Sequence, residues 1–276
     1  MAIHLGGSSR NSLAAVREVL DKTLSGLSGD AASALSTDLF AVVNVLGQNI
    51  SLRRAITDPS RQADEKGALL KQLFGARISD KALAVATAAV SHRWSSSGDL
   101  LISLEQIAIQ AEAGAANERG ELDTLEEEIF SFTRLLVSNQ DLRNALNGNP
   151  DATAQKKALV DQVLKSATSS TKLLVTQVAN GLWGRNIESA LSDIAHATAA
   201  HRNLVVAHVQ SAIDLTNDQK SKLAAALSKQ VGQAVRVNVE TNPKVIGGVS
   251  IRFRDELIDG TVISRMADAS HALAGK

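Results

Sequence analysis

The chain repeats part of itself at an interval of ninety residues. Residues 35–72 can be laid over residues 125–162 without a gap, and 11 of the 38 positions are identical. An Ala- and Leu-rich composition would give roughly three identities by chance. In the earlier segment the identical positions are Leu35, Phe40, Leu46, Asn49, Leu52, Arg53, Ala55, Lys66, Ala68, Leu69 and Gln72. Because several of them are polar, a duplication explains the match better than two unrelated amphipathic helices with a similar pattern.

The first two hundred residues have the periodicity of α-helices. Apolar residues recur three and four apart, as at Leu13, Val16 and Leu20, and proline is almost absent. Ser79-Asp80 and Thr171 are residues that favour helix starts. A repeat of about ninety residues can hold several helices, so each copy is predicted to form a small helical bundle.

Further along, the register of the repeat shifts slightly. Trp94 pairs with Trp183 at an interval of 89. The two indoles are therefore predicted to anchor the core or a groove of each bundle, rather than to form a ligand site. The acidic run Glu126–Glu128 stands near the start of a predicted helix, where negative charge favours the helix dipole, and this explains it without a metal.

From residue 203 the pattern changes to a small α/β module. The segment 203–212 is rich in β-branched residues and reads as a strand. Thr216 and Gln219 form a capping box at the start of a helix. Alternating valines from Val235 and a second alternating run from Val249 predict two more strands, followed by a final helix over residues 261–274. The fold class is therefore mainly α, with a C-terminal strand–helix–strand–strand–helix module.

The adjacent glycines Gly247 and Gly248 raise the question of a phosphate-binding loop. Such a loop follows a strand and opens a helix, whose amides point at the phosphate. Here a strand follows instead, so the glycines and the nearby Pro243 are predicted to form a structural corner. Asp259 and Gly260 suit a second corner, a tight turn before the last helix.

Known catalytic and metal-binding motifs are missing from the sequence. It has no G-x-G-x-x-G, G-x-S-x-G or H-E-x-x-H pattern, and its six histidines are not spaced as ligand pairs. Without cysteine, neither disulfides nor thiolate chemistry are available. We therefore expect no catalytic residues, no metal, no cofactor and no small-molecule substrate.

Composition also excludes other classes of partner. Lysine plus arginine equals aspartate plus glutamate at 29 each, and aromatic residues are only 3%, which disfavours nucleic-acid binding. The N-terminal residues lack the features of a secretory signal, so none is expected. The longest apolar run, Ala82–Val90, is too short to cross a bilayer. Any membrane attachment is thus expected to come through a partner.

The C-terminal module resembles the delta subunit of F-type ATP synthases, whose mitochondrial counterpart is the oligomycin sensitivity-conferring protein. The residues that carry the resemblance are Ser211-Ala212, Leu215-Thr216, Asn242-Pro243, Ile246-Gly247-Gly248 and Asp259-Gly260-Thr261. Asn242 replaces an acid and Thr261 replaces a serine of the family pattern. The N-terminal helices fit less sharply, because the usual tyrosine of the first helix is missing.

The length of the chain departs further from ordinary family members, which are about ninety residues shorter. Removing one repeat leaves 276 − 90 = 186 residues, an ordinary length. We therefore predict an N-terminal bundle over residues 1–118, a duplicated helical segment over 119–202 and a C-terminal α/β domain over 203–276. The duplicated segment would contact another part of the stalk or head, extend the protein's reach or serve only as a spacer.

The resemblance implies a non-catalytic stator in the peripheral stalk of a proton-driven rotary synthase. The helical domain would grip N-terminal helices of the alpha subunits, and the C-terminal domain would bind the C-terminal helices of the b subunit. The protein would lie at the cytoplasmic face of the cell membrane, held there only through the complex. By position along the chain, the first helix and the helix with Ala82–Val90 would frame the alpha-binding groove, with the candidate residues Leu13, Val16, Arg17, Leu20 and Trp94.

Two other classes stay open at this point. A helical-repeat scaffold unrelated to rotary enzymes would share the duplication, but it would not need the ordered Ile-Gly-Gly and Asp-Gly-Thr corners. A hydrolase or nucleotide-binding protein would need the glycine pair to act as a phosphate loop.

Overall fold

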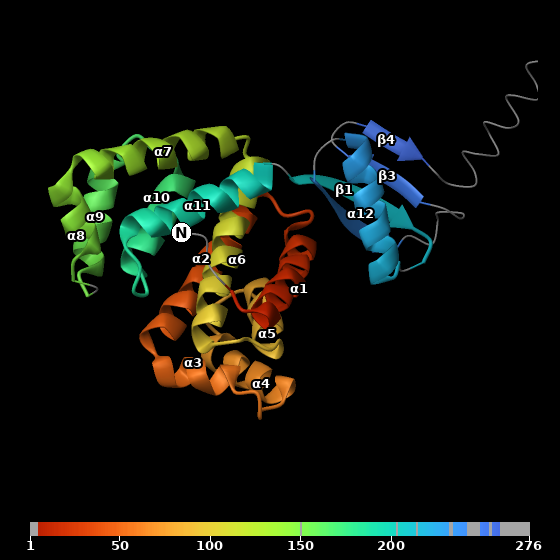
Figure 1. The fold of residues 1–276 in the computed structure, drawn as a ribbon, viewed down its shortest axis with the longest axis horizontal. Coiled ribbons are helices and arrows are strands. Elements are labelled where there is room, and N and C mark those ends of the chain that lie inside the picture. The colour runs from red at the N-terminus through yellow and green to blue at the C-terminus, as the bar shows by residue number, and fades with distance from the viewer. Residues whose placement is uncertain are drawn as a thin grey trace, which may run out of the picture. The chain divides into compact units, whose positions relative to one another are not determined.

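The computed structural model describes residues 5–149, 151–202, 204–213, 215–231, 234–241, 249–253 and 256–259. The chain folds into two compact units, residues 1–201 and 202–276. The first is helical and the second combines a sheet with a helix (Figure 1). This confirms the predicted fold class. None of the helices in the described part combines the length and hydropathy needed to span a bilayer.

The helical unit contains the same five helices twice. The first set is α2 (Gly29–Gln48), α3 (Ile50–Thr57), α4 (Ala63–Phe74), α5 (Asp80–Ser91) and α6 (Ser97–Glu118). The second set is α7 (Leu122–Ser138), α8 (Gln140–Asn147), α9 (Thr153–Val163), α10 (Ser169–Asn180) and α11 (Ile187–Arg202). The starts of α3, α4 and α6 recur ninety residues later in α8, α9 and α11, so the helices follow the spacing of the sequence repeat.

Helix α6 serves both copies. An additional helix, α1 (Gly7–Leu24), precedes the first set and packs against α5 and α6. Helix α6 begins ninety residues after α1 and packs against α7 and α10, as well as against α1, α2, α3 and α5. It therefore closes the first bundle (α1–α6) and opens the second bundle (α6–α11). The predicted boundary at residues 118 and 119 falls at its end, within one compact unit.

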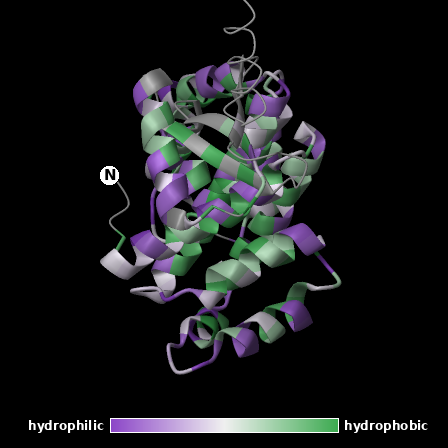
Figure 2. Cartoon of the chain, turned by 90° about the vertical axis from the view of Figure 1, so that its right-hand side faces the viewer, coloured by the Kyte–Doolittle hydropathy of each residue, from purple (hydrophilic) through white to green (hydrophobic). Residues whose placement is uncertain are grey.

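The sequence of α6 suits a helix that is covered on more than one side. Almost every residue from Leu100 to Ala116 is buried, whereas α1 and α7 each bury one stripe. Its second half is rich in alanine, which lets helices approach closely from two directions. Figure 2 shows that hydrophobic and hydrophilic residues alternate along many helices of the chain.

In each copy, an acid locks the start of the second-to-last helix. In the first bundle, Asp38 of α2 accepts a hydrogen bond from the backbone N–H of Ser79, the N-cap of α5, at 2.8 Å. In the second bundle, Glu128 of α7 binds the N–H of Thr168, the N-cap of α10, at 3.0 Å. These N–H groups lie at helix starts, where a carboxylate is stabilising.

The N-caps at Ser79 and Thr168 confirm one predicted helix start and correct another. Ser79 caps α5 as predicted, with its Oγ accepting from the N–H of Ala82 at 3.3 Å. The prediction that Thr171 starts a helix is wrong, because Thr168 takes the cap and α10 begins at Ser169. Glu128, the last residue of the acidic run Glu126–Glu128, therefore binds the start of α10 and not the start of its own helix, α7.

The second unit has the strand order β2-β1-β3-β4. Strands β1 (Leu204–Ser211) and β2 (Ala234–Thr241) are parallel and joined through α12 (Asn217–Val231), while β3 (Val249–Phe253) is antiparallel to β1. The predicted capping box is confirmed, with the N–H of Thr216 donating to Oε1 of Gln219 at 2.9 Å. Val235, Val237 and Val239 face one core with Leu223 and Leu227 of α12, as their alternation predicts.

The predicted corners fall mostly outside the described residues. The structure does not describe the corner residues Pro243, Gly247, Gly248 and Gly260. The final predicted helix also lies outside the described residues. Asp259 is described, and it ends a fourth strand, β4 (Glu256–Asp259), which pairs antiparallel with β3. Sequence reasoning places this segment in a turn and misses the strand, because Glu-Leu-Ile-Asp does not alternate between apolar and polar residues.

Candidate functional site

The apolar residues of the predicted groove lie in the core of the first bundle. Leu13, Val16 and Leu20 of α1 are buried, and so is Trp94 between α5 and α6. The indole Nε1 of Trp94 donates to the carbonyl of Ala89 at 2.8 Å. These side chains hold the bundle together, and their contact with a partner stays a prediction.

Arg17, the charged member of the set, lies where α1 meets α6. Its Nη2 donates to Oε1 of Gln106 at 3.4 Å. When the amide of Gln110 is turned, its oxygen also accepts from Nη2 and Nε of Arg17, at 3.0 and 3.1 Å. Arg17 is half-buried, so it both joins two helices and borders the surface of the bundle.

The start of α1 is held to the segment before α6. Oγ of Ser9 accepts from the N–H of Ser95 at 2.8 Å, and Oγ of Ser12 donates to the carbonyl of Arg93 at 2.6 Å. Gly6 is needed at the close approach, because a Cβ there would lie 2.2 Å from Oγ of Ser95. The α1–α5 face is thus a fixed surface rather than a loose helix.

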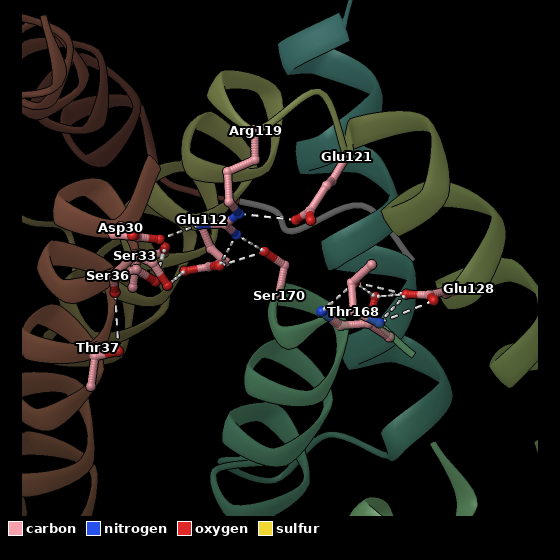
Figure 3. A network of polar contacts seen from close by, with 12 residues as sticks. Asp30, Ser33, Ser36, Thr37, Glu112, Arg119, Glu121, Glu128, Thr168 and Ser170 are labelled. Carbon is pink, nitrogen blue, oxygen red and sulfur yellow. Dashed lines mark hydrogen bonds and ion pairs between the residues drawn. The ribbon is translucent and has the colours of Figure 1, made fainter. Parts of the chain in front are cut away.

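A buried carboxylate of α6 ties the two bundles together (Figure 3). Glu112 is fully buried and accepts from Oγ of Ser33 in α2 at 2.8 Å and from Oγ of Ser170 in α10 at 2.6 Å. Nη2 of Arg119 lies 3.4 Å from the same carboxylate and 2.6 Å from Oγ of Ser170. Because one acid of α6 binds groups from α2 and α10, its role is to join the helices.

A second buried carboxylate lies two turns earlier on α6. Oε2 of Glu105 accepts from Nη2 of Arg185, and Nη1 of Arg185 also binds Oδ2 of Asp193 in α11 at 2.7 Å. Burial raises the pKa of Glu105 to about 7, although the charge and hydrogen bond of Arg185 lower it. Burial likewise raises the pKa of Asp193.

The two tryptophans occupy different surroundings. Trp94 bonds within its own bundle, whereas Trp183 packs against the first copy. A Cβ built on Gly47 of α2 would lie 2.1 Å from Cη2 of Trp183, and one built on Gly181 would lie 2.5 Å from Cζ2. Trp183 also has a φ of 50°, which is uncommon outside glycine. The indole thus locks the turn after α10 against α2.

Sequence reasoning did not single out Glu105, Glu112 or Arg185. The available signal was the spacing of the two acids, which places them seven residues apart on one face of an otherwise apolar helix. In the described part of the chain, no cluster of three or more potential metal ligands occurs. The buried carboxylates Glu105 and Glu112 are engaged by side chains of neighbouring helices and of the turn after α10, as befits a structural interface.

Known proteins share both the sequence pattern and the length of this chain. A family model for the ATP synthase delta (OSCP) subunit matches residues 110–273. The chain is 40% identical to ATP synthase subunit delta of Streptomyces coelicolor, over 97% of this chain and 98% of the relative. It is 36% identical to that of Streptomyces griseus over 98% and 100% of the two chains. For Kineococcus radiotolerans the identity is 37% over 98% of each.

The position of the family match differs from the sequence-based assignment. The match begins within α6 and takes in the second bundle and the α/β unit. The sequence-based assignment instead aligned the family's helical domain with the first copy. A start inside α6 agrees with the geometry, in which α6 opens the second bundle.

Proposed function

Because this chain belongs to the ATP synthase delta (OSCP) subunit family, we propose that it links the catalytic head of a rotary synthase to its b-subunit stalk and resists rotor torque. The family is a non-catalytic, structural part of the synthase. The observation that carries the proposal is the similarity to delta subunits across 97% of the chain, which includes both bundles and the α/β unit.

The helical unit is the part that would hold the head. We expect N-terminal helices of the alpha subunits to dock on α1 and α5, where exposed or half-buried small side chains lie outside the buried stripes. These residues are Ala14 and Ala15 on α1 and Ala84 and Ala88 on α5. Small residues let an amphipathic helix approach closely. The fixed start of α1 supports this assignment, since a preformed surface costs less to bind.

The α/β unit would bind the C-terminal helices of the b subunit, and the protein would lie at the cytoplasmic face of the membrane as a peripheral part of the complex. A stator must also transmit force between these two ends. The shared helix α6 and its Glu112, which binds groups of both copies, support this role because they join the two bundles directly.

The proposal is tested by purifying the tagged full-length chain from its own cells in mild detergent and identifying what accompanies it by mass spectrometry. Near-stoichiometric recovery of alpha, beta and b subunits is expected. Recovery of the chain alone, or with proteins unrelated to the synthase, would overturn the proposal and favour a free-standing helical scaffold.

The head contact has its own test in the charge of Arg17. Arg17→Glu is expected to weaken binding of an alpha N-terminal peptide to the full chain, measured by fluorescence anisotropy. Lys22→Glu is the matched control, because Lys22 is an exposed cation on the same helix outside the α6 contact. Unchanged peptide binding by Arg17→Glu would remove Arg17 from the contact.

A further inference from the structure

Helix α7 carries an apolar stripe on its outer side. Phe130, Arg134 and Val137 follow the spacing i, i+4, i+7, so they share one face. Phe130 is 64% exposed and Val137 69% exposed, and the guanidinium of Arg134 lies 6.0 Å from the ring centroid of Phe130. Leu135 flanks the stripe and is also exposed.

The opposite face of α7 packs in the core of the helical unit. Its buried residues are Leu122, Leu125, Ile129, Phe132 and Leu136. The helix is therefore docked through an ordinary amphipathic face, and the outer stripe is additional apolar surface. Scattered exposed apolar residues are common, but three of the six large exposed apolar residues of the described chain lie within eight residues of α7, which points to a binding surface.

The internal repeat shows what covers the same stripe in the first copy. Ninety residues earlier stand Phe40, Asn44 and Gly47 of α2. Phe40 is only 2% exposed. Nδ2 of Asn44 donates to Oε1 of Gln177 in α10 at 3.1 Å, and the ring of Trp183 covers Gly47. At Asn44 and Gly47, the stripe of α2 is therefore covered by Gln177 of α10 and by Trp183 in the turn after it.

We propose that the α7 stripe (Phe130, Arg134 and Val137) is a docking surface for an amphipathic helix from another subunit of the synthase. The inference rests on the proposed function and adds a site separate from α1 and α5. A helix is the expected occupant because, on the equivalent stripe, Asn44 bonds to Gln177 of helix α10. The partner helix would then lie on the second copy in the way that the second copy lies on the first.

The residues that differ between the α2 and α7 stripes predict which side chains the partner helix carries. Val137 replaces Gly47, so the partner needs a small side chain there instead of an indole. Arg134 replaces Asn44 and calls for a carboxylate on the partner, while exposed Glu127, one turn before Phe130, calls for a cation. Phe130 and Val137 are seven residues apart, about 10 Å along the helix, which matches apolar partner residues at heptad spacing.

The proposal is tested by placing the photoreactive residue p-benzoylphenylalanine at position 130 of the tagged full chain in its own cells. After irradiation, the synthase is purified and cross-linked peptides are identified by mass spectrometry. A cross-link to a helical segment of another synthase subunit is expected. The control is the same residue at position 50, because Ile50 is also exposed, at 53%, but lies at the start of α3.

Other outcomes separate this inference from the function on which it rests. An intact synthase without a cross-link from position 130, or with a link to a second copy of this chain, would overturn the docking surface alone. Failure to recover any synthase would overturn the proposed function and the docking surface with it. A link equally strong from position 50 would also count against a specific surface.

A charge reversal provides a second readout. Arg134→Glu in the photoreactive chain is expected to lower the cross-link yield about fivefold to tenfold, since it places like charges together. Arg54→Glu, at an exposed position of α3, should leave the yield unchanged. Thermal unfolding of the free chain should be the same for both variants. An unchanged yield with Arg134→Glu would overturn the predicted partner chemistry.

Discussion

Phe40 and Phe130 occupy the same position of the same helix in the two copies, but one is buried and the other faces solvent. The difference lies in the next segment of the chain after each copy. The second copy places Gln177 of α10 and the ring of Trp183 against α2. Within the described residues no third helical copy is present to cover α7. Repeat architectures behave in this way, because each unit completes the core of its neighbour and the last unit has an open side.

Truncating both phenylalanines should give the largest contrast. Phe40→Ala is expected to lower the free energy of unfolding by about 3–5 kcal/mol, because it leaves a cavity in the core. Phe130→Ala should change it by less than about 0.5 kcal/mol, as at other surface positions. Urea unfolding followed by circular dichroism measures both. Similar losses of unfolding free energy in the two variants would show that Phe40 and Phe130 are buried to a similar extent.

The second contrast is the acid on the shared helix. Glu105 has Ala15 ninety residues before it and Ala195 ninety residues after it, so only α6 carries a carboxylate at this place. Burial raises the pKa of Glu105 from 4.5 to about 7. A raised pKa means that the folded state binds the proton more tightly than the unfolded state. Its stabilising effect is therefore complete at low pH and is lost as the pH rises towards 7.

This sign gives a measurable slope. Between about pH 4.5 and 7, the free energy of unfolding of the native chain should fall relative to Glu105→Gln by up to about 1.4 kcal/mol per pH unit. Above this range the difference should be constant. Urea unfolding of both proteins across this range provides the test. Parallel pH profiles would mean that Arg185 keeps Glu105 ionised in the folded protein.

The sequence was sufficient for most of the local structure and for the existence of two copies, although it missed β4 and misplaced the start of α10. The capping box at Thr216 and Gln219 and the alternating valines from Val235 depend on near neighbours, and both were predicted correctly. The different fates of Phe40 and Phe130 could not be predicted, because identical residues differ only in their tertiary surroundings. For the same reason, the sequence did not predict that α6 belongs to both bundles. The burial of Glu105 and Glu112 on this helix was therefore not predicted either.

The third contrast is the glycine of α2 that α7 lacks. Gly47→Ala improves helix propensity by about 1 kcal/mol, but its Cβ would collide with the ring of Trp183, and overpacking costs about 1–3 kcal/mol. We expect a net loss of about 1 kcal/mol, seen as a lower Tm and an altered tryptophan emission. Val137→Ala, at the equivalent exposed position, should leave both unchanged.

A second substitution tests the cause of that loss. If the collision is responsible, Gly47→Ala should be less destabilising in a Trp183→Leu background, where the ring is gone. An equal loss in both backgrounds would place the effect in α2 itself. Coupling between two residues in contact is expected to be about 0.5–3 kcal/mol.

The smallest contrast compares the two acidic locks. Glu128→Ala should cost about 1–2 kcal/mol, because it leaves the N–H and hydroxyl of Thr168 and the buried hydroxyl of Thr171 without this acceptor. Asp38→Ala should cost about 0.5 kcal/mol, since its bond to the N–H of Ser79 is at an exposed site where water can replace it. Thermal unfolding of the two variants measures the difference. Equal costs would indicate that the helix dipole, which both acids share, outweighs the additional hydrogen bonds of Glu128.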